Sequence, residues 1–478
     1  MSRKIIGPFS RVEGHLEIDL NRNGPSVVDA QVNSPMYRGM ETILLDRAPM
    51  DALTIVPRIC GICSVSQSVA AAQALAKLSD VSPPKNGQLI TNLVLACEML
   101  SNHLTHFYLF FMPDFARDIY ANRRWHTNAL RFQAQRGNAQ AEVLDARNRF
   151  LHMMGELAGK WPHTLALRPS GTTSTVHAAQ KRKLKTILTG MRRFLETTLF
   201  GCPLNDMLAL KSKSDLHTWA KEGRGDLGFF IHLSEALSFH EMGKSQSVLL
   251  AGGGLPLENK ELFKQGIFKD QHFAPLPVDK INEDISHSFM AGATVQFPQN
   301  AKNDPDLDQN NAYSWCKAPR LGSERCEVGA LARHVISGHP LFCDLYVQEG
   351  STVKSRIFAR AWEMAFLVDA MESWIDQIDP TAPFYTPFTP AQNGHAFAFI
   401  EAARGTLGHW ISVENNKITN YQIIAPTTWN FSPRDQAGQP GPLESALEGA
   451  PILSGEDDPV SVQHIVRSFD PCMACTVH

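Results

Sequence analysis

Two Cys-x-x-Cys pairs, one near each end of the chain, constrain this sequence more than any other feature. Cys60 and Cys63 form the first pair, and Cys472 and Cys475 form the second, three residues before the final residue, His478. Thiolates suit zinc, iron–sulfur clusters, copper(I), nickel and low-spin iron. Structural zinc sites usually separate their two pairs by only about 15–20 residues. Spacing alone therefore leaves three alternatives open: a catalytic thiolate–metal site, a structural zinc site, or two unrelated pairs.

Composition and charge exclude several classes of protein. The 478-residue chain has 43% hydrophobic and 19% charged residues, as an ordinary globular protein does. A net charge of −3 gives no reason to expect nucleic acid or an anionic membrane. The most apolar stretch, residues 89–112, is interrupted by Glu98, Asn102 and two histidines, which indicates a buried helix rather than a transmembrane segment. Nine cysteines without an apolar export signal favour reduced thiols in a cytoplasmic protein.

Hydrophobic periodicity predicts an α+β protein with a mainly helical core and small β layers near both termini. Alternation in residues 4–34 predicts two or three strands, and residues 49–80 have a helical pattern. A long helix is expected to end at Pro113, and Ser351 is expected to cap another. The remaining expected elements are helices near 138–159, 174–200 and 228–240, a hairpin with strands at 410–413 and 418–421, and an irregular or partly β surface excursion at 252–312.

The sequences that flank the cysteines help to choose between a catalytic metal site, a structural zinc site and two unrelated pairs. Six stretches occur in a distinctive order: 11–15 (RVEGH), 38–41 (RGME), 58–63 (RICGIC), 401–405 (EAARG), 425–430 (APTTWN) and 468–478 (SFDPCMACTVH). Together they resemble the large subunit of the nickel–iron hydrogenases, from the first strand to the last residue. The resemblance implies a single α+β domain over residues 1–478, built around a long helix bundle and paired with an iron–sulfur small subunit.

The resemblance assigns all four cysteines to one nickel–iron centre, whose iron carries two cyanides and one carbon monoxide. It implies that Cys60 and Cys472 are terminal nickel ligands and that Cys63 and Cys475 bridge nickel and iron. Glu13, which could otherwise be an exposed acid, matches the residue that accepts a proton from the thiolate of Cys472. The implied enzyme is an H2:acceptor oxidoreductase that cleaves H2 heterolytically into two protons and two electrons. Zinc in the same four-sulfur cage is the remaining alternative for the metal.

Further side chains match the surroundings of that centre. Arg404 corresponds to an arginine above the open metal position, and Asp470 corresponds to the acid that orients it. Arg404 and Thr427 fall where the family donates hydrogen bonds to the cyanides. Asn102 stands where the family usually has an aspartate near this arginine, and Ala403 replaces a common proline. These two departures are expected to change the tuning of the site rather than its metals.

The resemblance also implies a second ion. Glu41, His478 and the backbone carbonyl of Ile423 match the ligands of a magnesium-type ion. Because magnesium prefers oxygen ligands, the histidine is unusual, and the assignment rests on the resemblance. The alternative for His478 is a frayed terminus.

Three side chains resemble the H2-sensing, regulatory branch of the family. Ile62 replaces a common valine and Phe110 a common leucine, both at the mouth of the family's gas channel. Gln67 replaces a common histidine. Larger side chains would narrow the gas channel and hinder O2, which is bulkier than H2, so we expect an O2-tolerant H2 sensor. The alternative explanation is that these substitutions repack the core without a functional effect. The absence of an extension after His478 is also typical of the sensor branch.

The remaining five cysteines do not have the spacing of an iron–sulfur site. We therefore expect the electron-carrying clusters in a partner small subunit, and a histidine kinase as a further partner of a sensor. The alternative function is a metabolic uptake hydrogenase that feeds a respiratory acceptor. A scaffold that has lost its metals, like the related subunit of respiratory complex I, is disfavoured because all four cysteines are present.

Overall fold

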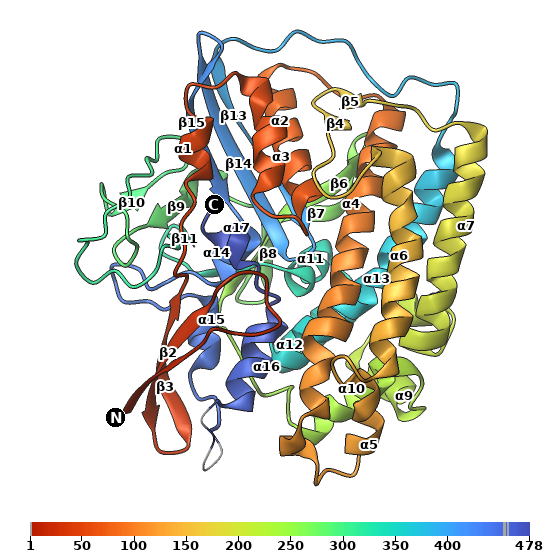
Figure 1. Cartoon of the computed structure of the whole chain (residues 1–478), viewed down its shortest axis with the longest axis vertical. Coiled ribbons are helices and arrows are strands. Elements are labelled where there is room, and N and C mark those ends of the chain that lie inside the picture. The colour runs from red at the N-terminus through yellow and green to blue at the C-terminus, as the bar shows by residue number, and fades with distance from the viewer. Residues whose placement is uncertain (1, 453–455, 457) are drawn as a thin grey trace.

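Four long helices pack together on one side of the molecule (Figure 1). The computed structural model describes residues 2–452, 456 and 458–478. Helix α13 packs against α4 and α7, and α6 packs between α4 and α7. The helices of the described residues are α1 Met40–Leu44, α2 Ala52–Ile55, α3 Ser64–Leu78, α4 Lys85–Thr105, α5 His126–Ala129, α6 Asn138–Ala158, α7 Ala178–Phe194, α8 Leu204–Leu208, α9 Lys213–Lys221, α10 Gly225–Ala236, α11 Ala330–Ser337, α12 Pro340–Glu349, α13 Val353–Gln377, α14 Pro426–Asn430, α15 Pro442–Leu447, α16 Val460–Ser468 and α17 Met473–Thr476.

The strands form small separate sheets beside this bundle. The largest antiparallel meander is β13-β14-β15, and α3 packs against it (Figure 1). An N-terminal meander, β1-β2-β3, confirms the strands expected in residues 4–34. The strands are β1 Ser2–Ile6, β2 Glu17–Asn23, β3 Ser26–Asn33, β4 Leu167–Arg168, β5 Gly171–Thr172, β6 Val248–Leu257, β7 Lys260–Lys269, β8 His272–Ala274, β9 Ile281–Asp284, β10 Val295–Gln296, β11 Ala318–Leu321, β12 Cys326–Glu327, β13 Gly394–Ala402, β14 Gly405–Glu414 and β15 Lys417–Ile424. The mixed architecture is the α+β class that the sequence predicts.

The long helix of residues 89–112 changes form before its proline. Regular α-helix ends at Thr105, and residues His106–Phe111 continue it as a π-helical turn. A 3-10 turn, Met112–Ala116, then contains Pro113. Proline has no N–H to donate and cannot continue the α-helical ladder, so the chain tightens there. The prediction of the helix was correct, but α4 itself is shorter than expected.

Two other expectations need correction. Thr352, not Ser351, caps α13, because its side chain accepts the N–H of Ser355 in a reciprocal capping box. The hydroxyl of Ser351 instead donates to Glu327. In residues 252–312 the partly β expectation is correct, but β6 is buried over most of its length and packs against β13. That part of the segment belongs to the interior, not the surface.

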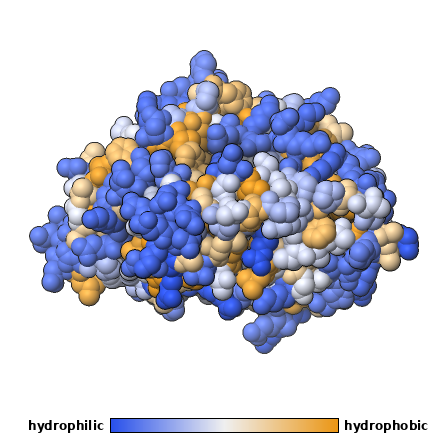
Figure 2. All heavy atoms as spheres, turned by 90° about the horizontal axis from the view of Figure 1, so that it is seen from above, coloured by the Kyte–Doolittle hydropathy of each residue, from blue (hydrophilic) through white to orange (hydrophobic). Residues whose placement is uncertain are grey.

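The four cysteines of the two pairs lie within the main apolar core. Figure 1 places the C-terminus inside the molecule, and His478 is buried. The face shown in Figure 2 is mainly hydrophilic, with smaller apolar patches between polar groups. Among the described residues, no helix combines the length and the apolar character that crossing a membrane requires.

Candidate metal centre

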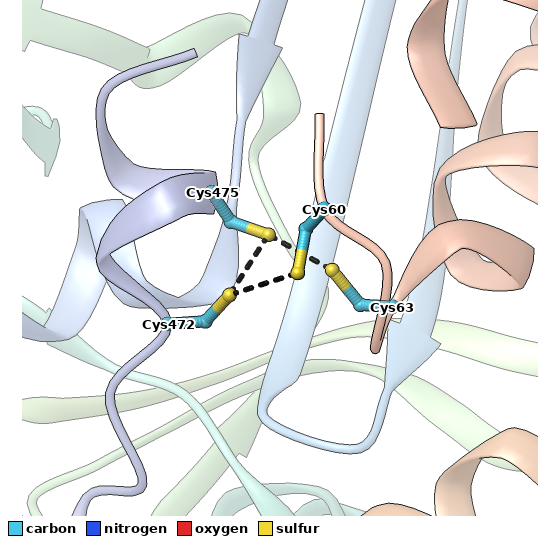
Figure 3. A group of neighbouring side chains, drawn as sticks. All are labelled: Cys60, Cys63, Cys472 and Cys475. Carbon is cyan, nitrogen blue, oxygen red and sulfur yellow. Dashed lines mark hydrogen bonds between the residues drawn. The ribbon is translucent and has the colours of Figure 1, made fainter. Parts of the chain in front are cut away.

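The two Cys-x-x-Cys pairs meet at one buried point (Figure 3). All four Sγ atoms lie within 4.8 Å of one another. Cys60 lies 3.4 Å from Cys472, Cys63 lies 2.9 Å from Cys475, and the two sulfurs of the second pair are 3.2 Å apart. These distances exceed the length of a disulfide bond, and all four cysteines are free. The fold therefore forms a four-sulfur cage from the two ends of the chain.

Short contacts between the chain ends hold this cage together. The first pair lies in the turn before α3, where Cys63 is the N-cap residue, and in the second pair Cys472 is the N-cap of α17 and Cys475 lies within that helix. The N–H of Met473 donates to the carbonyl oxygen of Glu13 at 2.7 Å. Arg38 Nη2 donates to the carbonyl oxygens of Ile59 and Ala474, both at 2.5 Å. One guanidinium thus joins the two cysteine segments, a role that the sequence did not reveal.

The cage has the electrostatics of a cation site. Hydrogen bonds from the neighbouring thiols lower the pKa of Cys60 well below its ordinary value. The same neighbours raise the pKa of Cys63 and of Cys475 well above it. Without a metal, the cage therefore resists carrying four thiolate charges at once. A soft cation would offset their repulsion, so the donors fit a thiolate-bound transition metal.

A small cavity adjoins one side of the cage. Its wall contains Cys63, Cys472 and Cys475 together with Arg404 and Thr427. Its other lining residues are Ser66, Gln67, Ala402, Ala403, Leu407 and Pro426. The wall is mostly apolar with a few polar groups, which suits small uncharged gases and diatomic ligands.

Arg404 is buried and fixed above this cavity. Its Nε donates to the carbonyl oxygen of Asp470 at 2.9 Å, and Nη2 donates to Asp470 Oδ1 at 3.1 Å. Burial alone would lower its pKa, but the Asp470 carboxylate and the cage thiolates raise the pKa overall. Nη1 has no hydrogen-bond partner among the described residues, so one donor remains available. The expected pairing of Arg404 with Asp470 is present.

Thr427 and Glu13 both contact the backbone of the second cysteine pair. Thr427 Oγ1 accepts the backbone N–H of Cys472 at 3.1 Å, which leaves its own O–H free to donate. Glu13 is partly buried and forms a β-bridge with Cys472. Burial and the negative charge of Cys60 raise the pKa of Glu13, although Arg404 and Arg38 oppose this. A carboxyl group with a raised pKa holds a proton more readily than an exposed carboxyl group does, which suits a residue that exchanges protons.

Comparisons with known proteins agree with this geometry. The family model described as Nickel-dependent hydrogenase matches residues 38–141 and 118–478. The chain belongs to the nickel-dependent hydrogenase family. The periplasmic [NiFeSe] hydrogenase large subunit of Desulfomicrobium baculatum is 30% identical over 99% of this chain and 94% of that protein. The Hydrogenase-2 large chain of Escherichia coli K12 is 26% identical over 100% of this chain and 97% of that protein.

Solved structures show the same fold. The Ni-Fe-Se hydrogenase from D. vulgaris Hildenborough in the reduced state superimposes with a TM-score of 0.85 at 28% identity, covering 100% of both chains. The chain is thus a nickel–iron hydrogenase large subunit, an H2 oxidoreductase that catalyses H2 oxidation. The four cysteines of this hydrogenase form one buried group of sulfur donors with the spacing to hold a metal ion.

In this hydrogenase the residues expected around a second ion also converge. Glu41 Oε1 accepts the N–H of Ile423 at 2.8 Å and lies 3.3 Å from His478 Nε2. The same Nε2 lies 2.8 Å from the carbonyl oxygen of Ile423. Buried Lys317 pairs with Glu283 at 2.6 Å close by. Burial alone would raise the pKa of Glu41, but Lys317 and His478 lower it overall. The donors are compatible with a divalent ion, and His478 is ordered rather than frayed.

The structure also places the other residues that the sequence singled out. Ile62 and Phe110 are partly exposed, and Gln67 is buried beside the cavity. Asn102, at the position of the family's usual aspartate, makes no hydrogen bond with Arg404 among the described residues. Its Nδ2 donates instead to the carbonyl oxygens of Ile62 at 2.8 Å and Glu98 at 3.0 Å. The physical reason is that an amide N–H can bind these carbonyls, whereas a carboxylate would repel them.

Sequence reasoning missed two further supports of the hydrogenase centre. Arg360 donates to the carbonyl oxygens of Ser468 and Phe469, just before Asp470. Glu98 accepts hydrogen bonds at the start of α3, directly after Cys63. Both are ionisable residues on the buried faces of long helices, α13 and α4. A buried charge in an apolar stripe needs partners, and that need was the available signal.

Proposed function

We propose that this hydrogenase serves as an O2-tolerant H2 sensor. The observation that carries the proposal is a set of three residues that depart from the family's common pattern: Ile62 within the first cysteine pair, Gln67 in the cavity wall and Phe110 in the turn after α4. Ile62 lies between the two cysteines of the first pair, and Phe110 lies in the π-helical turn after α4. Each has a larger side chain than the residue common in the family. A narrower gas path would slow O2, which is bulkier than H2, more than it slows H2.

Gln67 supports the same function by its environment. Its Oε1 lies 2.8 Å from His409 Nε2, and His409 Nδ1 lies 2.8 Å from the Tyr421 hydroxyl. Burial lowers the pKa of His409 to about 3, so this histidine stays neutral. A glutamine cannot be protonated, unlike the histidine common at this position. The wall of the cavity next to Gln67 therefore keeps the same charge over the physiological pH range.

The alternative function is a metabolic uptake hydrogenase that feeds a respiratory acceptor. A relative from Bradyrhizobium diazoefficiens, the Uptake hydrogenase large subunit, is 24% identical over 100% of this chain. The two functions differ in rate and in partners. Slow turnover that survives air, together with binding to a histidine kinase, supports the sensor; fast turnover that is lost in air supports the uptake enzyme.

Smaller side chains at Ile62 and Phe110 test whether these residues restrict the entry of O2. The double variant I62V and F110L should lose H2 oxidation activity in air faster than the wild type does, because O2 would reach the centre more readily. The matched control is I55V, a valine substitution at a partly buried isoleucine in α2, which should leave the O2 response unchanged. Equal inactivation rates for the double variant and the wild type would refute the channel argument.

For the centre, we propose that Cys60 and Cys472 are terminal nickel ligands and that Cys63 and Cys475 bridge nickel and iron. One observation supports this assignment: the Sγ atoms of Cys63 and Cys475, 2.9 Å apart, are closer together than those of Cys60 and Cys472 or those of Cys472 and Cys475. Arg404 Nη1 and the Thr427 hydroxyl would donate hydrogen bonds to the cyanides. Bound there, the centre supplies the heterolytic cleavage of H2.

The protein side chains would then guide protons and hold the second ion. Glu13 would accept the proton that leaves Cys472, since its backbone pairs with that cysteine and its pKa is raised. Glu41, His478 and the carbonyl of Ile423 would hold Mg2+ or a similar ion. Such an ion would fix the last residue to β15 and so keep the second cysteine pair in place.

Electrons require a partner in this proposal. The cage lies just below a surface, since Cys63 retains 8% exposure and its neighbour Ile62 is partly exposed. We propose that an iron–sulfur small subunit covers this surface with an obligate interface of roughly 2,000 Å2 or more. The free state of the cysteines is compatible with a cytoplasmic complex. A histidine kinase would bind this complex if it acts as a sensor.

A further inference from the structure

The turn that carries the first cysteine pair is held by two buried side chains from α4. We propose that Glu98 and Asn102, the α4 clamp, fix the position of Cys63 and thereby tune the nickel–iron centre. The two residues are four positions apart, so they lie one helical turn apart on the same face of α4. Neither touches the cage sulfurs, so both are positioning residues.

Asn102 holds the chain on the N-terminal side of Cys63. Its Nδ2 donates to the carbonyl oxygen of Ile62 at 2.8 Å and to that of Glu98 at 3.0 Å. An amide nitrogen has two hydrogens, so both donors are used. The peptide bond between Ile62 and Cys63 is thus tied to the bundle.

Glu98 holds the chain on the C-terminal side of Cys63. Its Oε2 accepts the N–H of Val65 at 2.8 Å and the indole N–H of Trp161 at 3.2 Å. Its Oε1 accepts the N–H of Ser66 at 2.9 Å and the Ser66 hydroxyl at 2.7 Å. Cys63 occupies the N-cap position of α3 but makes no side-chain capping bond. The first N–H groups of a helix need acceptors, and Glu98 supplies them from another helix.

The α4 clamp therefore brackets Cys63 within a few residues on both sides. The segment before Cys60 is held differently, by Arg38 through the carbonyl of Ile59. Burial raises the pKa of Glu98 to about 7, and in its ionised form this side chain also offsets the positive end of the α3 dipole, which would otherwise draw electron density from the Cys63 sulfur. Loss of the clamp should shift the thiolate and weaken its donation to the metals.

The test uses the purified complete hydrogenase with its native small subunit, and the variants E98Q and N102L. Each has a matched control elsewhere in the same chain. Glu444 is likewise a buried acid that accepts two backbone N–H groups, that of Val32 in β3 and that of Gly441 at the start of α15, so E444Q controls for E98Q. Asn86 is likewise a buried α4 asparagine that donates to two backbone carbonyls, so N86L controls for N102L.

Outer supports of metal ligands typically contribute 10- to 100-fold to affinity or activity, so we expect kcat/KM for H2 to fall by about that factor in E98Q and N102L. The infrared stretch of the iron-bound carbon monoxide should move to higher wavenumber, because weaker sulfur donation leaves less electron density for back-donation. E444Q and N86L should lower the melting temperature about as much as the clamp variants do, but they should keep the wild-type carbon monoxide band. Loss of nickel and iron from the clamp variants alone would also support the proposal.

An unchanged carbon monoxide band and unchanged kcat/KM in N102L would overturn the proposal, and N102L decides alone if E98Q does not fold. The milder variant W161F removes one donor to Glu98 and should shift the band in the same direction by less. The inference rests on the proposed bridging role of Cys63 and not on the sensor function. If the wild-type protein contains no nickel, the proposed nickel–iron centre is wrong. Failure of the clamp proposal and failure of the proposed centre therefore give different results.

Discussion

At the scale of single residues, burial shifts the pKa values of the two ionisable side chains beside the cage in opposite directions. Burial and the Cys60 charge raise the pKa of Glu13, so its carboxyl group holds a proton more readily than an exposed one does. Arg404 has its pKa raised by Asp470 and the thiolates despite burial, so it remains charged. One group can carry protons, and the other supplies a fixed positive charge for electrostatic stabilisation.

Replacing Glu13 by glutamine should slow H2 oxidation by about 100-fold or more, because general acid–base groups typically contribute that much. Nickel and iron contents should remain at the wild-type level, since Glu13 is not a ligand. The measurements are H2–D2 exchange and metal analysis. Glu17, a neighbouring acid that accepts the Asn33 amide in the β2–β3 pair, provides the control E17Q. Full exchange activity in E13Q would rule out this proton route.

The sequence predicted the cysteines of this site but not the residues that hold them in position. Cysteine pairs, a terminal histidine and charged motifs are visible as residue types, and the structure brings the four cysteines together as predicted. The role of Asn102 could not be read in the same way, because its partners are backbone carbonyls, which every residue carries. Glu98 was seen only as an interruption of an apolar run, since its partners lie in α3.

At the scale of elements, the turn between β13 and β14 places Arg404. The two strands pair up to Ala402 and Gly405, so Arg404 sits in a very tight connection. Gly405 has φ +128°, a conformation that disfavours other residues. A Cβ at Gly405 would lie 2.7 Å from the backbone nitrogen of Gly329. The turn thus needs glycine both for its backbone angle and for close approach.

Replacing Gly405 by alanine should lower the free energy of unfolding by about 1–3 kcal/mol, the usual strain of such a conformation. It should also lower kcat, because the displaced turn carries Arg404. Thermal melting and H2 oxidation measure the two effects. In the control G155A, the added Cβ in α6 meets no atom within 4 Å, so stability should rise by about 0.5–1 kcal/mol. Unaltered melting and activity in G405A would contradict the strained-turn explanation.

Periodicity located most of the long elements but not their ends. The helices expected near 138–159 and 228–240 correspond to α6 and α10, and the 410–421 hairpin corresponds to β14 and β15. The π-helical turn after α4 and the buried strand β6 were not predicted, because tertiary packing decides both. Glycines at 252–254 suggested a loop, yet a Cβ at Gly252 would lie 2.7 Å from Phe399 Cβ in β13. Small residues are needed there for strand packing.

At the scale of the whole molecule, one buried ion network joins the helix bundle to the β13–β15 sheet. Glu363 of α13 binds Arg333 of α11 at 2.5 Å and His103 of α4 at 2.8 Å. Arg333 also binds Glu401 of β13 at 3.0 Å and the carbonyl oxygen of Ala402 at 2.7 Å. The network therefore reaches the strand end that carries Arg404.

Removing the charge of Glu363 in E363Q should cost about 3–5 kcal/mol of stability, as when one partner of a buried ion pair is lost. Burial alone would raise the pKa of Glu363, but Arg333 and the two histidines hold it well below its ordinary value of 4.5. A depressed pKa stabilises the fold above pH 4.5, and this stability is lost as the pH falls below it.

The melting temperature of the wild type should therefore fall more steeply below pH 4.5 than that of E363Q. The variant E241Q, at a highly exposed glutamate, should follow the wild type at every pH. Parallel curves for E363Q and the wild type would show that this network does not govern acid stability.

The two ends of the chain are brought to one point, and the metal centre depends on this arrangement. Order along the sequence could not show it, because the cysteine pairs are separated by nearly the whole chain. The family resemblance predicted that the two cysteine pairs meet. The structure shows what holds them together: the hydrogen bond between Glu13 and Met473 and the two hydrogen bonds of Arg38.

The most direct test of the central claim is metal analysis combined with infrared spectroscopy of the anaerobically purified native hydrogenase. A nickel–iron centre on Cys60, Cys63, Cys472 and Cys475 predicts one nickel for each iron of the centre, with cyanide and carbon monoxide bands in the infrared. The variant C475S should lose these bands. Zinc as the sole metal, or a wild-type protein without cyanide and carbon monoxide bands, would contradict the account.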